Sequence, residues 1–201
     1  LPFAPRELID ISDVEKEKRR KTVEYLSELI KMGGSIGVDK FVVHPSSEPI
    51  SESERKEKLK CAKESLSKLA DVAERFNAVI CVEDLPRTCL GNSAEEMKFL
   101  TEEDERLRIC FDTNHITADK PENVIRELKN KIVTLHVSDF DFVDEKHWIP
   151  GDGEINWSEV VKALKDIKYN GVWMYEVGFQ SRSGELKLSD FKKNAEKILL
   201  A

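Results

Sequence analysis

Residues 106–115 read RLRICFDTNH, and they restrict the folds that the chain can adopt. The stretch begins as an apolar run of the kind found in a buried β-strand. It then places Asp112, and three residues later His115, where a turn is expected. A buried carboxylate costs free energy unless a cation, a salt bridge or hydrogen bonds compensate its charge. The stretch therefore predicts a buried strand whose carboxyl end delivers polar groups to a site.

Four further apolar runs have the same character. They are nearly continuous in Val, Ile, Leu and aromatic residues, which is typical of parallel strands covered on both faces. They read KFVVHP from Lys40, AVICVED from Ala78, IVTLHVSD from Ile132 and GVWMYEV from Gly171. Helices are predicted around them, at residues 14–32, 51–76, 93–100, 121–130, 157–167 and 188–200. This alternation, at roughly 25–40 residues per unit, is that of βαβ crossovers.

Two architectures are built from such units, an open doubly wound sheet and a (β/α)8 TIM barrel. No strand is followed by the GxGxxG pattern of dinucleotide-binding sheets. A barrel collects polar residues at the carboxyl ends of several strands. Each run here ends in one: His44, Glu83, Asp112, His136 and Glu176. We therefore expect an α/β fold, a (β/α)8 TIM barrel, with residues 1–201 forming a single partial domain.

The number of strands falls short of a closed barrel. Five full runs are visible, and LPF at residues 1–3 resembles the end of an earlier strand. A closed barrel needs about three more strands. The sequence is therefore predicted to lack the N-terminal strands, and to cover the barrel from the end of its third strand to its eighth.

Composition excludes several classes of function. The 201 residues are 40% hydrophobic and 35% charged, and no run is long and apolar enough to cross a membrane. The net charge of −7 argues against a broad nucleic-acid footprint. The four cysteines show no CxxC spacing, so we expect reduced thiols in a cytoplasmic protein. Whether the chain forms a homo-oligomer stays open.

Three carboxylates, Glu83, Asp112 and Glu176, are each the first ionisable residue after an apolar run. Any one of them alone could cap a helix or pair with an arginine. A barrel, however, would point all three at one mouth, where their mutual repulsion requires a cation.

The four histidines all lie outside the predicted helices, at His44, His115, His136 and His147. A single histidine is usually a core or surface residue, but His136 is level with the carboxylates and is the best candidate ligand. Three carboxylates and one imidazole suit Mn²⁺, Mg²⁺ or Co²⁺ better than a closed structural zinc site. Such an ion can act as a Lewis acid on a carbonyl or hydroxyl oxygen.

With these residues the chain resembles the xylose-isomerase-like (β/α)8 superfamily, in its sugar phosphate isomerase/epimerase branch. The matching pieces are HP at His44, VEDLPR at residues 82–87, FDTNH at 111–115, LHVSD at 135–139, HWIPGDGEINW at 147–157 and YEV at 175–177. The resemblance implies that Glu83, Asp112, His136 and Glu176 bind one divalent metal. It also implies a small-molecule carbohydrate substrate.

The mechanism that the resemblance implies is proton transfer at a carbon next to a carbonyl. The catalytic residues would be Glu83 and Glu176, one removing the proton and the other returning it, while the metal holds the enediolate oxygens. His115 matches a position that contacts substrate oxygen. His44, His147 and Arg87 would line the mouth. Isomerase, epimerase and dehydratase activities all remain open.

Two alternatives belong to other classes. One is an endonuclease IV-like, zinc-dependent enzyme that cleaves DNA at abasic sites, because His44, His115 and His147 match three of its additional histidines. That family has an Asp-x-His pair where this chain has Glu145 and His147, and the acidic net charge argues against DNA. The other is a non-catalytic sugar-binding barrel, although none of the four predicted ligands is lost. Asp139 and Asp141 are predicted to form loop hydrogen bonds rather than to bind metal.

Overall fold

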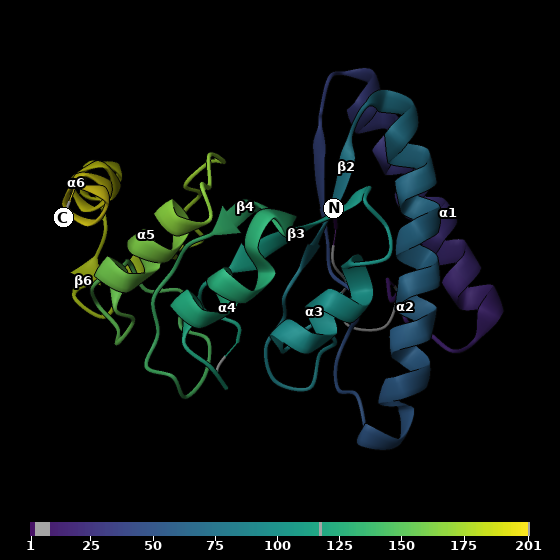
Figure 1. Cartoon of the computed structure of the whole chain (residues 1–201), viewed down its shortest axis with the longest axis horizontal. Coiled ribbons are helices and arrows are strands. Elements are labelled where there is room, and N and C mark those ends of the chain that lie inside the picture. The colour runs from purple at the N-terminus through teal and green to yellow at the C-terminus, as the bar shows by residue number, and fades with distance from the viewer. Residues whose placement is uncertain (3–8, 117, 201) are drawn as a thin grey trace. The chain divides into compact units, whose positions relative to one another are not determined.

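The computed structural model describes residues 1–2, 9–116 and 118–200 and divides into two compact units, Leu1–Cys110 and Phe111–Ala201 (Figure 1). The expected single domain therefore stays a prediction. The strand end expected at residues 1–3 includes Phe3, which lies outside the described residues. None of the helices in the described ranges is long and apolar enough to span a membrane.

The first unit is built on parallel strands in the order β1 (Lys40–Val43), β2 (Val79–Glu83) and β3 (Leu107–Asp112). The register pairs Phe41 with Ile80 and Val82 with Ile109. Ile80 and Cys81, which point to opposite faces of β2, are both fully buried, as a strand covered on both faces requires. This pairing brings the carboxyl ends of β1 and β2 to the same edge of the sheet.

The helices of this unit are α1 (Lys16–Ser35), α2 (Glu52–Ala73), the short 3-10 helix η1 (Glu74–Phe76) and α3 (Ala94–Thr101). The two long helices α1 and α2 lie side by side (Figure 1). Gly34 allows a close approach, because a Cβ there would lie 2.4 Å from Cγ of Phe76. A side chain at this position would push the end of α1 away from η1.

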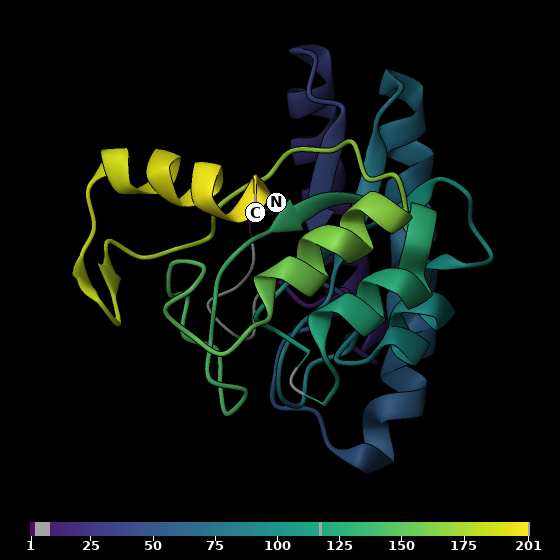
Figure 2. The same cartoon turned by 60° about the vertical axis from the view of Figure 1, so that its left-hand side comes forward.

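The second unit contains α4 (Pro121–Leu128), the 3-10 helix η2 (Lys129–Lys131), β4 (Ile132–His136) and α5 (Trp157–Asp166). A hairpin of β5 (Gln180–Ser181) and β6 (Gly184–Glu185) and then α6 (Leu188–Leu199) follow. The helices α4 and α5 pack side by side, as Figure 2 shows in green.

The end of β3 lies beside the end of β4 within this second unit. The backbone N–H of Thr113 donates to the carbonyl of His136 at 3.1 Å. The Thr113 hydroxyl donates to the carbonyl of Ser138 at 2.6 Å and accepts from its N–H at 3.0 Å. The residues that follow the two strands are thereby fixed next to each other.

The fifth strand, predicted at residues 171–177, is not formed as a regular strand. The segment makes one isolated parallel bridge, between Val137 and Tyr175. The N–H of Val137 donates to the carbonyl of Met174 at 2.8 Å, and the N–H of Glu176 donates to the carbonyl of Val137 at 3.1 Å. The side chains of Val172 and Met174 are 56% and 48% exposed. The prediction of a strand covered on both faces is therefore wrong here, because the part of the chain that the structure describes leaves one face of the segment exposed at Val172 and Met174.

The pH dependence of the first unit's stability should report on Asp104. Hydrogen bonds from the Arg106 guanidinium, at 2.9 and 2.7 Å, lower the pKa of this carboxyl below its usual value. A lowered pKa stabilises the fold above the unfolded value of about 3.9, and this stabilisation is lost as the pH falls through the folded value. Asp104→Asn should lower the free energy of unfolding at pH 7 by about 1 kcal/mol.

Urea denaturation from pH 7 down to pH 2.5 tests this prediction. The difference between wild type and Asp104→Asn should shrink as the pH falls below 4. Asp39→Asn is the control, since its carboxylate is 72% exposed. A difference that stays constant over the whole range would contradict the assignment.

Candidate metal centre

Three of the predicted ligands lie together in the second unit, each at a strand end or in the segment paired to one. Asp112 ends β3, His136 ends β4, and Glu176 follows the Tyr175 bridge. Nδ1 of His136 lies 2.6 Å from Oε2 of Glu176 and 4.0 Å from Oδ2 of Asp112. The backbone N–H of Glu176 donates to the carbonyl of Val137 at 3.1 Å, which ties this segment to the end of β4.

This donor set fits a divalent ion. Ligands bound to one such ion at about 2.0–2.3 Å lie within about 4.6 Å of one another. The distances from His136 to both carboxylates satisfy that limit. Asp112 is fully buried, and its Oδ1 accepts the N–H of Asn114 at 2.7 Å, which fixes the direction of the carboxyl group. Two carboxylates and an imidazole, close together and partly buried, have the chemistry of a cation site.

The fourth predicted ligand, Glu83, lies in the first unit at the end of β2 and is 2% exposed. Its Oε2 lies 3.1 Å from Nε2 of His44, which directly follows β1. Each unit therefore brings together some of the predicted residues. The full set of four in one site stays a prediction.

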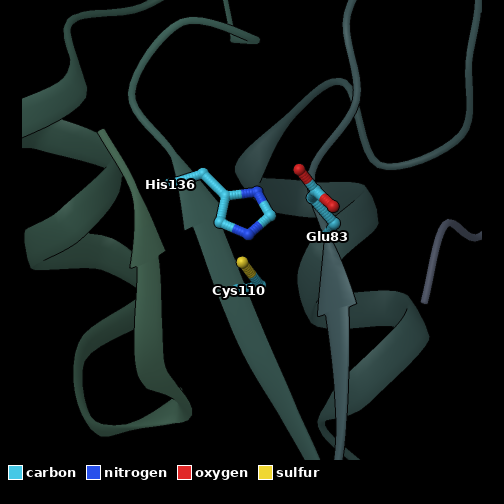
Figure 3. Close-up of side chains that lie close together, drawn as sticks. All are labelled: Glu83, Cys110 and His136. Atoms are coloured by element: carbon cyan, nitrogen blue, oxygen red, sulfur yellow. The ribbon is translucent and has the colours of Figure 1, made fainter. Parts of the chain in front are cut away.

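Cys110 is a residue that the sequence analysis missed. It lies on β3 directly opposite Glu83 in the parallel register, and its sulfur is within 4.8 Å of the Glu83 carboxylate. Figure 3 shows the strands that carry Glu83, Cys110 and His136. Alternation along β3 could have revealed it, since residues two apart point to the same face and Cys110 precedes Asp112 by two.

A second group in the second unit consists of His115, Glu145 and His147, which each offer a ligand atom within 4.8 Å of the others. His115 is 6% exposed, and its Nε2 lies 3.7 Å from Oδ2 of Asp112 and 3.8 Å from Oε2 of Glu145. The predicted residues His115 and His147 are thus neighbours, with ring centroids 6.2 Å apart. This group adjoins Asp112.

The backbone of Glu176 fixes the orientation of His147. Nδ1 of His147 lies 3.1 Å from the Glu176 carbonyl oxygen. A carbonyl only accepts hydrogen bonds, so Nδ1 carries a proton, and in the neutral imidazole Nε2 is then the acceptor. His147 also has a left-handed φ of 50°, and the N–H of neighbouring Lys146 donates to Oδ1 of Asn114 at 3.2 Å. One hydrogen bond therefore orients the imidazole, and a second fixes the backbone that precedes it.

Asp139 forms loop hydrogen bonds, as the sequence predicts. Its buried carboxylate accepts four, from the N–H groups of Phe140, Gly151 and Ile155 and from the indole N–H of Trp157, at 2.9, 2.7, 3.2 and 2.8 Å. A Cβ on Gly153 would lie 2.3 Å from Oδ1 of Asp139, so the turn passes too close for a side chain. This carboxylate closes the loop that carries His147.

Arg87 follows β2 in the loop of the first unit and is bound by Glu48. Its Nη2 lies 2.6 Å from Oε1 of Glu48, and its Nε lies 3.1 Å from Oε2. The predicted role of Arg87 in substrate binding stays a prediction.

Comparison with known proteins identifies the family of the chain. The family model of the xylose isomerase-like TIM barrel matches residues 1–195. The chain belongs to this family. The prediction of the superfamily and of an α/β barrel fold from sequence is thereby confirmed.

The relatives of this TIM-barrel chain include sugar epimerases and a probable nuclease. It is 29% identical to an uncharacterised protein of Methanocaldococcus jannaschii, over 84% of this chain and 61% of the relative. It is 33% identical to a D-psicose 3-epimerase of Ruminiclostridium cellulolyticum, over 54% of this chain and 37% of the relative. A probable endonuclease 4 of Acholeplasma laidlawii is 25% identical, over 78% and 60%. The chain thus spans less than two thirds of the length of these relatives.

The solved structures that are similar to this member of the family also include sugar epimerases. A D-tagatose 3-epimerase-like protein superposes with a TM-score of 0.82 at 27% identity, over 98% of this chain and 73% of the other. D-psicose 3-epimerase from Clostridium cellulolyticum H10, solved with D-tagatose, gives 0.73 at 26% identity, over 98% and 71%.

Asp139→Asn should loosen the loop at residues 140–157. An asparagine presents an NH₂ group to N–H donors, so at least one of the four hydrogen bonds is lost and the stability should fall by about 2 kcal/mol. Hydrogen exchange at the amides of Gly151 and Ile155 should accelerate. Asp141→Asn is the matched control, because this carboxylate lies in the same loop, accepts the N–H of Val143 at 3.1 Å and is 27% exposed rather than buried. Unchanged exchange in Asp139→Asn would contradict the role given to this carboxylate.

Proposed function

We propose that this chain carries the catalytic end of a divalent-metal-dependent sugar epimerase or isomerase. The observation that carries the proposal is the group formed by Asp112, His136 and Glu176 at the ends of adjacent strand segments, with Nδ1 of His136 2.6 Å from the Glu176 carboxylate. The sugar epimerases among its relatives support a small carbohydrate as the substrate. Inversion at carbon 3 of a ketose is the activity that their names favour.

One divalent ion, Mn²⁺, Mg²⁺ or Co²⁺, would be held by Glu83, Asp112, His136 and Glu176. Two observations support the inclusion of Glu83. It is opposite Cys110 in the β2–β3 register, and Asp112 lies two residues beyond Cys110 on the same strand. Side chains two residues apart in a strand point to the same face. Asp112 therefore points to the same face of β3 as Cys110, the residue opposite Glu83. When bound, the ion polarises substrate oxygens and makes the neighbouring C–H more acidic.

The two glutamates would exchange the proton. One carboxylate removes the proton from the carbon next to the carbonyl, and the electron pair of the C–H bond passes to form an enediolate. The other carboxylate returns a proton to the opposite face of the carbon, and the carbonyl forms again. His44 beside Glu83 and His136 beside Glu176 orient these carboxylates.

Substrate hydroxyls would be bound by His115 and His147. Because Nδ1 of His147 is engaged by the Glu176 carbonyl, its Nε2 accepts a hydrogen bond from a hydroxyl group. The buried position of His115 next to Asp112 suits a contact with a substrate oxygen close to the ion. Arg87 lies at the rim in the loop after β2.

A second candidate is a zinc-dependent nuclease of the endonuclease IV type. The observation that favours it is the group of His115, Glu145 and His147, which could hold an additional ion beside Asp112. Its test is cleavage of a duplex with one abasic site by the zinc-loaded protein. Cleavage that is lost in His147→Gln would establish this activity in place of the epimerase. The net charge of −7 favours the sugar.

The epimerase proposal predicts solvent exchange at the reacting carbon. The Mn²⁺- or Co²⁺-loaded protein, incubated in D₂O with D-tagatose, D-psicose or D-fructose, should incorporate deuterium into at least one sugar, as NMR would show. Glu83→Gln and Glu176→Gln should each lower the rate by at least about 100-fold, because each removes an acid–base group. Glu185→Gln, on the exposed strand β6, should exchange like the wild type.

Two results would contradict the mechanism. One is the absence of deuterium from every sugar tested, which, together with measurable sugar binding, would instead support a non-catalytic barrel. The other is undiminished exchange in Glu83→Gln, which would remove that residue from the proton transfer.

A further inference from the structure

An arginine and a glutamate from neighbouring strand-end loops of the first unit form a two-point ion pair. Nη2 of Arg87 donates to Oε1 of Glu48 at 2.6 Å, and Nε donates to Oε2 at 3.1 Å. This is the side-on fork geometry in which a guanidinium binds a carboxylate most strongly. The side chains are 41% and 29% exposed, so an incoming solute can reach the pair.

The pair lies at the end of the first unit's sheet that carries Glu83, one of the proposed catalytic groups. Glu48 is in the loop after β1, four residues past His44, and Arg87 is in the loop after β2, four residues past Glu83. The two anchoring residues, His44 and Glu83, are themselves in contact at 3.1 Å. The ion pair therefore lies in the loops that follow His44 and Glu83, which we call the rim.

The backbone of Arg87 is also fixed. Its φ of 53° is in the left-handed region that non-glycine residues rarely adopt. Asn92 donates from Nδ2 to the Arg87 carbonyl at 2.7 Å, which holds this loop conformation. The guanidinium is thus presented to Glu48 by a loop that is held in place.

The ion pair between Arg87 and Glu48 determines the charge that the loops after β1 and β2 present to a ligand. A phosphate group binds best to a guanidinium edge through two parallel N–H donors, and Glu48 already occupies the Nε–Nη2 edge. The carboxylate also cancels the charge that would attract a dianion. In the second unit, Nζ of Lys146 in the loop after β4 likewise lies 4.0 Å from a carboxylate, that of Asp141. A basic side chain therefore lies near a carboxylate in the loops of both units, Arg87 near Glu48 in the first and Lys146 near Asp141 in the second.

We propose that Glu48 is a specificity-determining residue, which holds Arg87 so that neutral sugars bind in preference to sugar phosphates. The inference rests on the proposed function, because it concerns the substrate of the same site. Removing the carboxylate takes away the group that occupies the Nε–Nη2 edge, so phosphate can bind at that edge, and this gain requires Arg87.

Binding of inorganic phosphate to the Mg²⁺-loaded protein tests the inference directly. Calorimetry should show phosphate binding about fivefold tighter in Glu48→Gln than in the wild type, the gain expected from releasing an exposed ion pair. The double variant Glu48→Gln/Arg87→Gln should lose that gain. Glu52→Gln, a control that removes the same charge from the exposed start of α2, should bind phosphate like the wild type.

Equal gains in Glu48→Gln and Glu52→Gln, or a gain that persists without Arg87, would overturn the inference. If thermal unfolding shows that Glu48→Gln destabilises the fold, Glu48→Ser replaces it in the same series. Phosphate that binds at the ion contributes equally to the affinity measured in all variants. Differences in affinity between the variants therefore report on phosphate binding at Arg87.

Turnover separates this inference from the proposed function. Wild type should convert D-tagatose with a higher kcat/KM than D-tagatose 6-phosphate, and Glu48→Gln should narrow the ratio about fivefold. A wild-type preference for the phosphate would overturn the role of Glu48 while leaving the epimerase intact. Turnover of neither sugar would count against the proposed function, and the phosphate series would still decide whether Glu48 controls Arg87.

Discussion

The burial of Asp112 at the carboxyl end of β3 is the constraint on which the rest of the candidate site depends. An ionised carboxylate with no exposed surface needs compensation by hydrogen bonds or positive charge. The N–H of Asn114 supplies one hydrogen bond, and His136 and His115 approach the other oxygen to 4.0 and 3.7 Å. Two imidazoles from different segments of the chain thus lie close to the same oxygen, Oδ2 of Asp112.

A second buried carboxylate shapes the surroundings of that point. Asp139 lies three residues after His136 and gathers donors from across residues 140–157. The loop that it closes carries Glu145 and His147, which contact His115 and the Glu176 backbone. Asp112 therefore lies close to the candidate ligands His136 and His115, while Asp139 stabilises the loop that positions His147 near them.

Much of the fold could be predicted from the sequence because four strands are apolar on both faces. The runs that start at Lys40, Ala78, Arg106 and Ile132 all form strands that begin within one residue of the start of the run. The run at Gly171 is equally apolar in composition, but Val172 and Met174 are exposed, and composition does not reveal which neighbours cover a segment. That is why the fifth strand was predicted wrongly.

The candidate site was predictable only in part, for a similar reason. Strand-end position identified Asp112, His136 and Glu176, which do lie together. The contact between His147 and the Glu176 carbonyl joins residues 29 positions apart and depends on a left-handed backbone angle, so no local pattern indicates it. The pairing of Arg87 with Glu48, 39 positions apart, is likewise a product of strand register. Cys110 was overlooked because an apolar run conceals a thiol that faces the same side as Asp112.

If strand-end residues of this chain hold one divalent ion, the purified protein should contain that ion in a one-to-one ratio. After loading with Mn²⁺ and exhaustive dialysis, elemental analysis should find one ion per chain in the wild type. The content should be the same in Asp119→Asn, which alters an exposed carboxylate in the loop before α4, and should be lost in Asp112→Asn. Absence of bound metal from the wild type, or full retention of metal by Asp112→Asn, would rule out the proposed ion site.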